Sequence, residues 1–592
     1  MAVQKKVDVV TVGAGWTAAM LAWKLTAAGY HVVSLEQGPT RWANPDFAHN
    51  HDPLRFHVRH AMMVNLAKET WTWRPDPSAP SLPMRQYGTF NPGEGVGGAA
   101  IHWTAQLWRF LPSDFKYRSH HIERYGEAKL PKGALVQDWP LTYDDMEPYY
   151  DAFEYDIGAS GQVGNLNGRT IAGGNRFEGP RSRPYPLPPV ARSGASQMFE
   201  KATTELGYNP FPQPAGITST AYKGPLGANR AGCILCGFCT RYGCEVDAKA
   251  SPQNTHLPPA LATGRYEIRT GCKVTGVNTR SDGLASGLSY IDADGNQQEQ
   301  PADVVVLSGF TLTNVRMMLL HRSQQHPNGL GNAHGLVGKH YTYQLVKSPV
   351  QGVFDGRTFN LQAGNGVTQN VIYDFNSDNF DHGGLDFIGG AQISGVAGQS
   401  DPLTTMDNWP FSDGKQHPDQ PSWGAGWKEQ LRKRWQSSFS VDIEGESLPY
   451  EDQFLDLDPV YKGKDGLPLL RLTFDWHDND KKLYAYVAQK CAGIMKAMGP
   501  TEMDVAESLP DYEVHSYQST HPTGGAIMGS EPGTSVTNSY GQLWDTPNVF
   551  VTGAALFPQN PGANPTDTVG ALTYRLGDAL KDRYFKNADK LL

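Results

Sequence analysis

The chain has 592 residues, of which 39% are hydrophobic and 19% are charged, and its net charge is −9. This composition is typical of a globular protein of roughly two to four domains and excludes a disordered or fibrous chain. The acidic balance, without a run of Lys or Arg, excludes nucleic acid as an expected partner. No apolar stretch reaches the roughly 18 residues that a membrane-spanning helix needs.

The first elements expected in chain order form a strand–turn–helix–strand unit. Residues 7–12, VDVVTV, have the pattern of a buried strand, and a helical stretch covers 19–28. A second strand is expected over 32–36. The turn over 13–18 has the pattern G-x-G-x-x-A. This order of elements predicts a dinucleotide-binding unit.

Four residues carry the expected nucleotide chemistry. Gly13 permits the tight turn, Gly15 lets the backbone approach a pyrophosphate, and the small Ala18 lets the helix pack on the strand. Glu36 follows Gly15 by 21 residues, where an acid is expected to bind the ribose hydroxyls.

A second glycine-rich segment covers residues 93–100, GEGVGGAA, and His102 follows it. Gly95, Gly97 and Gly98 would let the backbone lie against a flat or charged ligand. By itself, the segment is equally compatible with an ordinary loop.

Four of the six cysteines, Cys233, Cys236, Cys239 and Cys244, lie within twelve residues with the spacing C-x2-C-x2-C-x4-C. This spacing resembles runs that hold an iron–sulfur cluster. Structural zinc usually uses two separated pairs, and disulfides between such close neighbours would be strained. We therefore expect an iron–sulfur cluster, with zinc or free thiols as alternatives. The other two cysteines, Cys272 and Cys491, are expected to be buried free thiols.

Two late segments, 519–529 and 560–568, contain His521 and Asn564. A histidine is the natural base for taking a hydroxyl proton near neutral pH. Read alone, His521 is more often a histidine in a turn than a catalytic base.

Taken together, GAGWTAA near the N-terminus, GEGVGGAAIHW at 93–103 and the late His and Asn-Pro segments resemble the glucose–methanol–choline (GMC) oxidoreductases. The resemblance implies that the dinucleotide is FAD and that the second glycine segment runs beside the isoalloxazine ring. It makes His521 the general base and Asn564 the residue that binds the substrate oxygen, with Asn560 as a rival. It also places His102, Gly553 and Thr566 near the flavin.

The resemblance implies an α/β fold with a Rossmann-like FAD-binding domain and a substrate domain built on a mainly antiparallel sheet. We expect the FAD domain to be discontinuous, over 1–150, 215–345 and 510–592, and to carry the cysteine run. An excursion is expected over 151–214 and the substrate domain over 346–509. Candidates for the substrate pocket are Tyr373, Asp381, His382 and the Trp-rich stretch 407–435.

Within the family, the cysteine run points to the flavoprotein subunits of bacterial membrane-associated sugar dehydrogenases, most of all to gluconate 2-dehydrogenase. The resemblance implies oxidation of a hydroxyl of a sugar acid, sugar or polyol, with D-gluconate to 2-keto-D-gluconate as the first choice. Electrons would leave through a [3Fe–4S] or, less favoured, a [4Fe–4S] cluster. The alternatives are a fructose, glucose or sorbitol dehydrogenase subunit, a GMC oxidase, or a non-catalytic zinc-binding subunit.

The same resemblance implies two partner proteins. A multihaem cytochrome c subunit would accept the electrons, and a small subunit would carry the export signal, since the N-terminus shows no clear signal peptide. The expected location is the periplasmic face of the bacterial inner membrane, with the chain held there only through its partner. Gluconate would need a cation for its carboxylate, and the sequence does not place one in the pocket.

Overall fold

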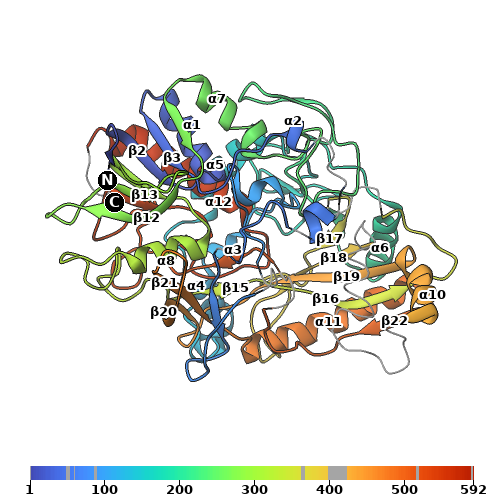
Figure 1. Ribbon diagram of the computed structural model, residues 1–592. Coiled ribbons are helices and arrows are strands. Elements are labelled where there is room, and N and C mark those ends of the chain that lie inside the picture. Colours follow the sequence, from blue (N-terminus) through green and yellow to red (C-terminus); the bar gives the residue numbers. More distant parts are fainter. Residues whose placement is uncertain are drawn as a thin grey trace.

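The computed structural model describes residues 2–587 and 591, apart from 48–51, 53, 59, 68, 86–89, 362–366, 398–422 and 515–518. Two large sheets organise the molecule, and both termini lie beside the first of them (Figure 1). None of the helices in the described residues is long and apolar enough to cross a membrane.

The first sheet has a parallel centre made from three distant parts of the sequence. Its parallel strands, in spatial order, are β11 (Tyr266–Arg269), β3 (Val32–Leu35), β2 (Val7–Val12), β14 (Gln297–Leu307) and β24 (Val549–Val551). Strands β13 (Ala285–Ile291) and β12 (Lys273–Thr279) extend β14 in antiparallel order, and β1 (Ala2–Val3) pairs with β14. The apolar runs of β2 and β14 are buried, as expected for strands covered on both faces.

Helices pack over this sheet and against one another. They are α1 (Trp16–Ala27), α12 (Thr566–Ala579), α5 (Tyr143–Ile157), α7 (Leu257–Ala262) and α8 (Thr311–Leu320). Helix α1 begins three residues before the helix expected from the sequence, directly after the glycine turn. The N-terminus of α1 therefore faces the predicted phosphate position.

The second sheet is antiparallel throughout. Its strands, in spatial order, are β22 (Glu502–Val505), β16 (Leu345–Val353), β19 (Ser438–Gly445), β18 (Ala391–Val396), β17 (Asn370–Ile372) and β8 (Phe211–Pro212). Helices α11 (Asp478–Met498) and α6 (Gly194–Glu205) contact these strands (Figure 1). The expected α/β class and the expected antiparallel second sheet are both present.

Two small sheets join these parts. One contains β20 (Phe454–Lys462), β21 (Pro468–Thr473), β4 (Thr72–Arg74) and β5 (Leu82–Pro83). The other pairs β15 (Thr342–Tyr343) with β23 (Pro522–Thr523).

The remaining elements are short. They are α2 (Ala43–Asp46), α3 (Pro112–Phe115), α4 (Tyr117–Tyr125), α10 (Gly424–Trp435), β6 (Asn165–Leu166), β7 (Arg169–Thr170), β9 (Tyr222–Lys223), β10 (Asn229–Arg230), the 3₁₀ helices Gly98–Ile101, Glu127–Lys129, Pro252–Asn254 and Ala554–Leu556, and the π-helical turns Leu54–Val58 and Leu580–Tyr584.

The stretch 151–214 is more regular than the sequence suggested. It contains the end of α5 and all of α6, which Ser193 caps by accepting a hydrogen bond from the Ser196 backbone N–H. The 12-residue α6 contacts β17 and β18, and its buried residues Ala195, Phe199 and Ala202 recur at helical spacing, so this stretch does contain a helical periodicity. The domain boundaries proposed from the sequence stay a prediction.

Candidate active site

The two glycine-rich segments, 80 residues apart in sequence, lie against each other. The Gly97 N–H donates to the Ala14 carbonyl at 2.8 Å, and a Cβ added to Gly98 would lie 3.4 Å from the Gly15 Cα. Gly13 and Gly97 have φ values of 86° and 94°, a region that favours glycine. Nothing would lie within 4 Å of a Cβ at Gly15, so its backbone borders open space where a ligand could approach.

Glu36 fixes this arrangement from the end of β3. One carboxylate oxygen accepts from the Ala14 N–H at 3.0 Å, and the other accepts from Gly38 and Gly95 at 2.9 and 3.2 Å. Burial raises the pKa of Glu36, and these backbone N–H groups oppose the rise. Glu36 thus ties together both glycine segments, and its predicted contact with the ribose stays a prediction.

The other residues predicted to hold the flavin surround the same region. His102 is buried, and its Nε2 has no hydrogen-bond partner among the described residues. Burial, together with the positive charge of Lys249, lowers the pKa of His102 to about 3, so the ring is neutral. Gly553, two residues after the end of β24, has φ 90°, and Thr566 is the first residue of α12. Both are half-buried.

His521 is held by Gln344, which the sequence did not single out. The β15–β23 pairing brings them together, and the His521 Nδ1 hydrogen-bonds to the Gln344 Oε1. The Gln344 amide nitrogen donates to the Pro561 carbonyl at 3.3 Å, which orients the amide oxygen toward His521. The hydrogen-bond network therefore assigns the proton of His521 to Nδ1 and leaves the lone pair on Nε2.

The environment of His521 suits a base. Burial lowers the pKa of His521 to about 4, so the imidazole is neutral and able to accept a proton near pH 7. The loop after β24 approaches it, because the Asn560 side-chain amide donates to the His521 carbonyl at 2.8 Å.

The two candidate asparagines differ in what remains for a substrate. The Asn560 amide nitrogen is bonded to the main chain of His521. Asn564 is buried, its side chain hydrogen-bonds to the Glu444 carboxyl, and its Oδ1 has no partner among the described residues. The choice of Asn564 over Asn560 as the substrate-binding residue stays a prediction.

Replacing Gln344 tests the proton position on His521. Gln344→Leu removes the acceptor for Nδ1–H, so we expect kcat to fall roughly 10- to 100-fold with little change in KM. Gln344→Glu places a carboxylate beside the ring and raises the pKa of His521. Because the base must be neutral, the acid limb of the kcat–pH profile moves upward from its position near pH 4. Gln351→Leu, the same replacement within β16, is the control. Identical profiles in all variants would contradict the assignment.

The four clustered cysteines lie on one loop between β10 and Lys249. Cys233, Cys239 and Cys244 pack in one apolar cluster with Ala105 and Ile217. Two thiols accept backbone N–H groups, Cys233 from Leu235 and Cys244 from Lys249, each at 3.4 Å. The donor set is of the right kind for an iron–sulfur cluster. However, in the part of the chain that the structure describes, no group of three or more His, Cys, Asp or Glu side chains is arranged to hold a metal ion.

Lys249 joins the cysteine loop to the second glycine segment. Its ammonium group donates to the carbonyls of Trp103, Cys239 and Tyr242, each at 2.7 Å, and the residue is 2% exposed. The Arg241 N–H also donates to the His102 carbonyl at 2.7 Å. Lys249 is therefore a buried residue and not a surface charge.

Of the suggested pocket residues, His382 is engaged elsewhere and Asp381 is exposed, while the place of Tyr373 in the pocket stays a prediction. Both ring nitrogens of His382 are used, Nδ1 by Asp378 at 3.0 Å and Nε2 by the Gly389 carbonyl at 2.9 Å, and Asp381 is exposed. Tyr373 is buried beside the rings of Trp108 and Phe211. Part of the Trp-rich stretch, 407–422, lies outside the described residues. Cys272 and Cys491 are free and buried, as predicted.

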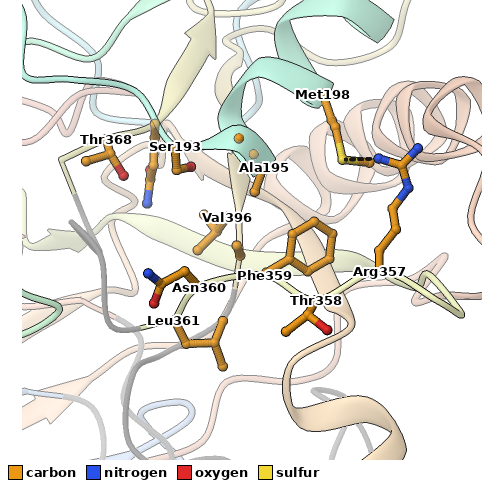
Figure 2. A pocket seen from close by; sticks show the side chains of 14 residues that line it. Ser193, Ala195, Met198, Arg357, Thr358, Phe359, Asn360, Leu361, Thr368 and Val396 are labelled. Carbon is orange, nitrogen blue, oxygen red and sulfur yellow. Dashed lines mark hydrogen bonds between the residues drawn. The ribbon is translucent and has the colours of Figure 1, made fainter.

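A cavity of about 570 Å³ lies away from this site, between the start of α6, the end of β18 and residues 357–361 (Figure 2). Phe359, Leu361 and Val396 form much of its apolar lining, and Arg357 hydrogen-bonds to the Met198 sulfur at its edge. None of the predicted site residues lines it.

Known proteins are similar to this chain over nearly its whole length. Family models described as GMC oxidoreductase match residues 140–346 and 449–573. A gluconate 2-dehydrogenase flavoprotein of Pantoea cypripedii is 39% identical over 99% of this chain and 95% of its own. A 2-methyl-1,2-propanediol dehydrogenase of Mycolicibacterium austroafricanum is 29% identical over 98% and 96%, and the fructose dehydrogenase large subunit of Gluconobacter japonicus is 26% identical over 97% of each chain.

A solved structure, pyridoxine 4-oxidase of Mesorbium loti, superposes with a TM-score of 0.58 over 97% of this chain and 98% of its own. At 14% sequence identity, this likeness shows the fold alone.

Proposed function

Because this chain belongs to the GMC oxidoreductase family, and is therefore an FAD-dependent oxidoreductase acting on CH–OH groups, we propose that its substrate is a sugar acid, sugar or polyol. D-gluconate, oxidised to 2-keto-D-gluconate, is the first choice, since a gluconate 2-dehydrogenase flavoprotein is similar over nearly the whole chain. A fructose, glucose or sorbitol dehydrogenase subunit is the second. The observation that carries the chemistry is the neutral His521, with its Nδ1 proton held by Gln344.

In this proposal, His521 takes the hydroxyl proton at Nε2, and the Asn564 side chain binds the substrate oxygen and holds the carbinol carbon in place. The chemistry that bound FAD supplies is acceptance of the hydride from that carbon. The open space at the Gly15 backbone and the unpaired Nε2 of His102 support a flavin in this position. The residues that would hold it are Gly13, Gly15, Ala18, Glu36, Gly95, Gly97, Gly98, His102, Gly553 and Thr566.

We further propose that Cys233, Cys236, Cys239 and Cys244 provide the ligands of an iron–sulfur cluster, with [3Fe–4S] favoured and [4Fe–4S] possible. Two features support this: backbone N–H groups already point at two thiols, and the buried Lys249 stands beside the loop. Both are typical of sites that stabilise negatively charged clusters. Through Lys249 and Arg241 the loop contacts the segment next to the predicted flavin, a suitable place for electrons to leave.

The proposed partners are a multihaem cytochrome c subunit as electron acceptor and a small subunit that carries the export signal. They would hold the chain at the periplasmic face of the bacterial inner membrane. A subunit assembly is supported by the similarity to a protein named as the large subunit of fructose dehydrogenase.

A substrate survey tests the proposed function. With FAD-loaded enzyme and an artificial electron-accepting dye, we expect kcat/KM to be highest for D-gluconate among gluconate, 2-ketogluconate, glucose, fructose and sorbitol. Oxygen in place of the dye should give at least tenfold less turnover and little peroxide. Equal turnover with oxygen would identify an oxidase instead, and no turnover with any of the five would overturn the proposed substrate class.

A further inference from the structure

Glu444 occupies an unusual place in the second sheet. It lies near the end of β19, an interior strand between β16 and β18, yet its side chain is half-buried and not fully buried. Exposure alternates along β19, with the half-buried Ser440, Asp442 and Glu444 on one face and fully buried apolar residues on the other.

The apolar face of β19 turns toward α11. A Cβ added to Gly352, which pairs with Phe439 of β19, would lie 2.5 Å from the sulfur of Met495 in α11. Glu444 therefore points away from α11. The loop that carries the candidate asparagines lies on the same face of the sheet as the Glu444 side chain, since the Asn564 side chain hydrogen-bonds to the Glu444 carboxyl.

The partners of Glu444 do not neutralise its charge. Gln392 donates to its carboxyl at 2.5 Å, and Gln106 and Asn564 also hydrogen-bond to it. All three are uncharged amides. The charged group that acts on the pKa of Glu444 is a second acid, Asp442, which raises it. No lysine or arginine of the described chain pairs with it. Burial raises the pKa of Glu444 to about 7, and its amide partners oppose the rise.

An acid in this setting is costly for folding. Burying a carboxylate without a cation reduces stability, so such groups are more often kept for binding or catalysis. Unpaired polar atoms surround Glu444: the Asn564 and Gln392 side-chain oxygens lack hydrogen-bond partners within the described residues. These oxygens and the carboxylate together form a wall suited to a ligand with several hydroxyl groups.

We propose that Glu444 is a specificity-determining residue that accepts a hydrogen bond from the substrate hydroxyl on the carbon next to the one being oxidised. This inference rests on the proposed function, in which Asn564 binds the reacting oxygen. Groups that share one hydrogen bond lie about 3 Å apart, which is also the spacing of hydroxyls on adjacent carbons. The site therefore selects compounds with two neighbouring oxygens, and a sugar acid binds with its carboxylate directed away from Glu444.

The test compares two substrates that differ in one hydroxyl, D-gluconate and 3-deoxy-D-gluconate, with 1,2-propanediol and 1-propanol as a neutral pair. We expect the wild-type enzyme to favour the hydroxylated member of each pair in kcat/KM by roughly 10- to 100-fold, the range for a hydrogen bond to a charged group. In Glu444→Gln this preference should fall at least fivefold, while the FAD content changes little.

Asp442→Asn is the matched control, because it removes the same charge from the same face while its own hydrogen bonds go to Ser348 and Ser440. It should keep the wild-type preference. If Glu444→Gln does not fold, judged by FAD content and melting temperature, Glu444→Asp replaces it. This variant keeps the charge but draws the carboxyl back by one methylene, and it should lose an intermediate part of the preference.

A result that overturns the role of Glu444 can be told apart from one that overturns the proposed function. If the wild-type enzyme oxidises gluconate but the Glu444 variants keep the full preference for the hydroxylated substrates, only the role of Glu444 is overturned. If FAD-loaded wild-type enzyme oxidises neither member of either pair, the proposed function falls and the inference falls with it.

Discussion

Replacing His521 with alanine is expected to slow flavin reduction by substrate roughly 10²- to 10⁴-fold, the usual contribution of a positioned general base. Without this base, the hydroxyl proton of the substrate must pass to water. The site is buried around position 521, so water is a poor substitute there. The measurement is the anaerobic loss of oxidised-flavin absorbance after rapid mixing with substrate, which isolates this step from later electron transfer.

Two comparisons make the result specific. His334→Ala, at an exposed position, should leave the rate within twofold of wild type. The FAD content of His521→Ala should be unchanged, because the predicted flavin contacts lie in other segments. A His521→Ala enzyme that is reduced at the wild-type rate would remove His521 from the mechanism and leave Gln344 as a purely structural residue.

The local motifs were predictable because their chemistry lies in short runs of sequence. The turn at Gly13, the acid at Glu36 and the cysteine spacing each need only a few neighbouring residues to be recognised. Their meeting in space was not predictable from spacing. The Gly97 N–H reaches Ala14 across 83 residues, and only the folded sheet brings them together. The family resemblance supplied the identity of the nucleotide as FAD and the expected roles of His521 and Asn564, which local patterns could not give.

The roles of three residues depend on contacts that the sequence did not show. Gln344 is 177 residues from His521, and nothing in its own surroundings marks it. Lys249 follows the cysteine run and looks like a surface charge until its ammonium group is found bonded to three buried carbonyls. Glu444 did leave a signal, since Ser440, Asp442 and Glu444 alternate with apolar residues and predict a polar face on β19.

Replacing a proposed ligand of the iron–sulfur cluster should separate the two halves of the proposed reaction. In Cys239→Ser we expect flavin reduction by substrate to stay within about threefold of wild type, because hydride transfer does not need the cluster. Transfer onward to a one-electron acceptor such as cytochrome c should fall at least 100-fold, since serine is a poor ligand for iron and the relay would be lost. Iron content and rapid-mixing kinetics of each half-reaction are the measurements.

Cys272→Ser is the control, a buried free thiol outside the run, and it should keep both iron and electron transfer. Replacing the four clustered cysteines one at a time separates the two cluster types. A [3Fe–4S] cluster needs three thiolates and is paramagnetic when oxidised, so one of the four variants should keep its iron and its EPR signal. A [4Fe–4S] cluster is EPR-silent when oxidised and needs all four. Wild-type protein that contains zinc or no metal would contradict the relay, and electrons would then have to leave the flavin directly, as in an oxidase.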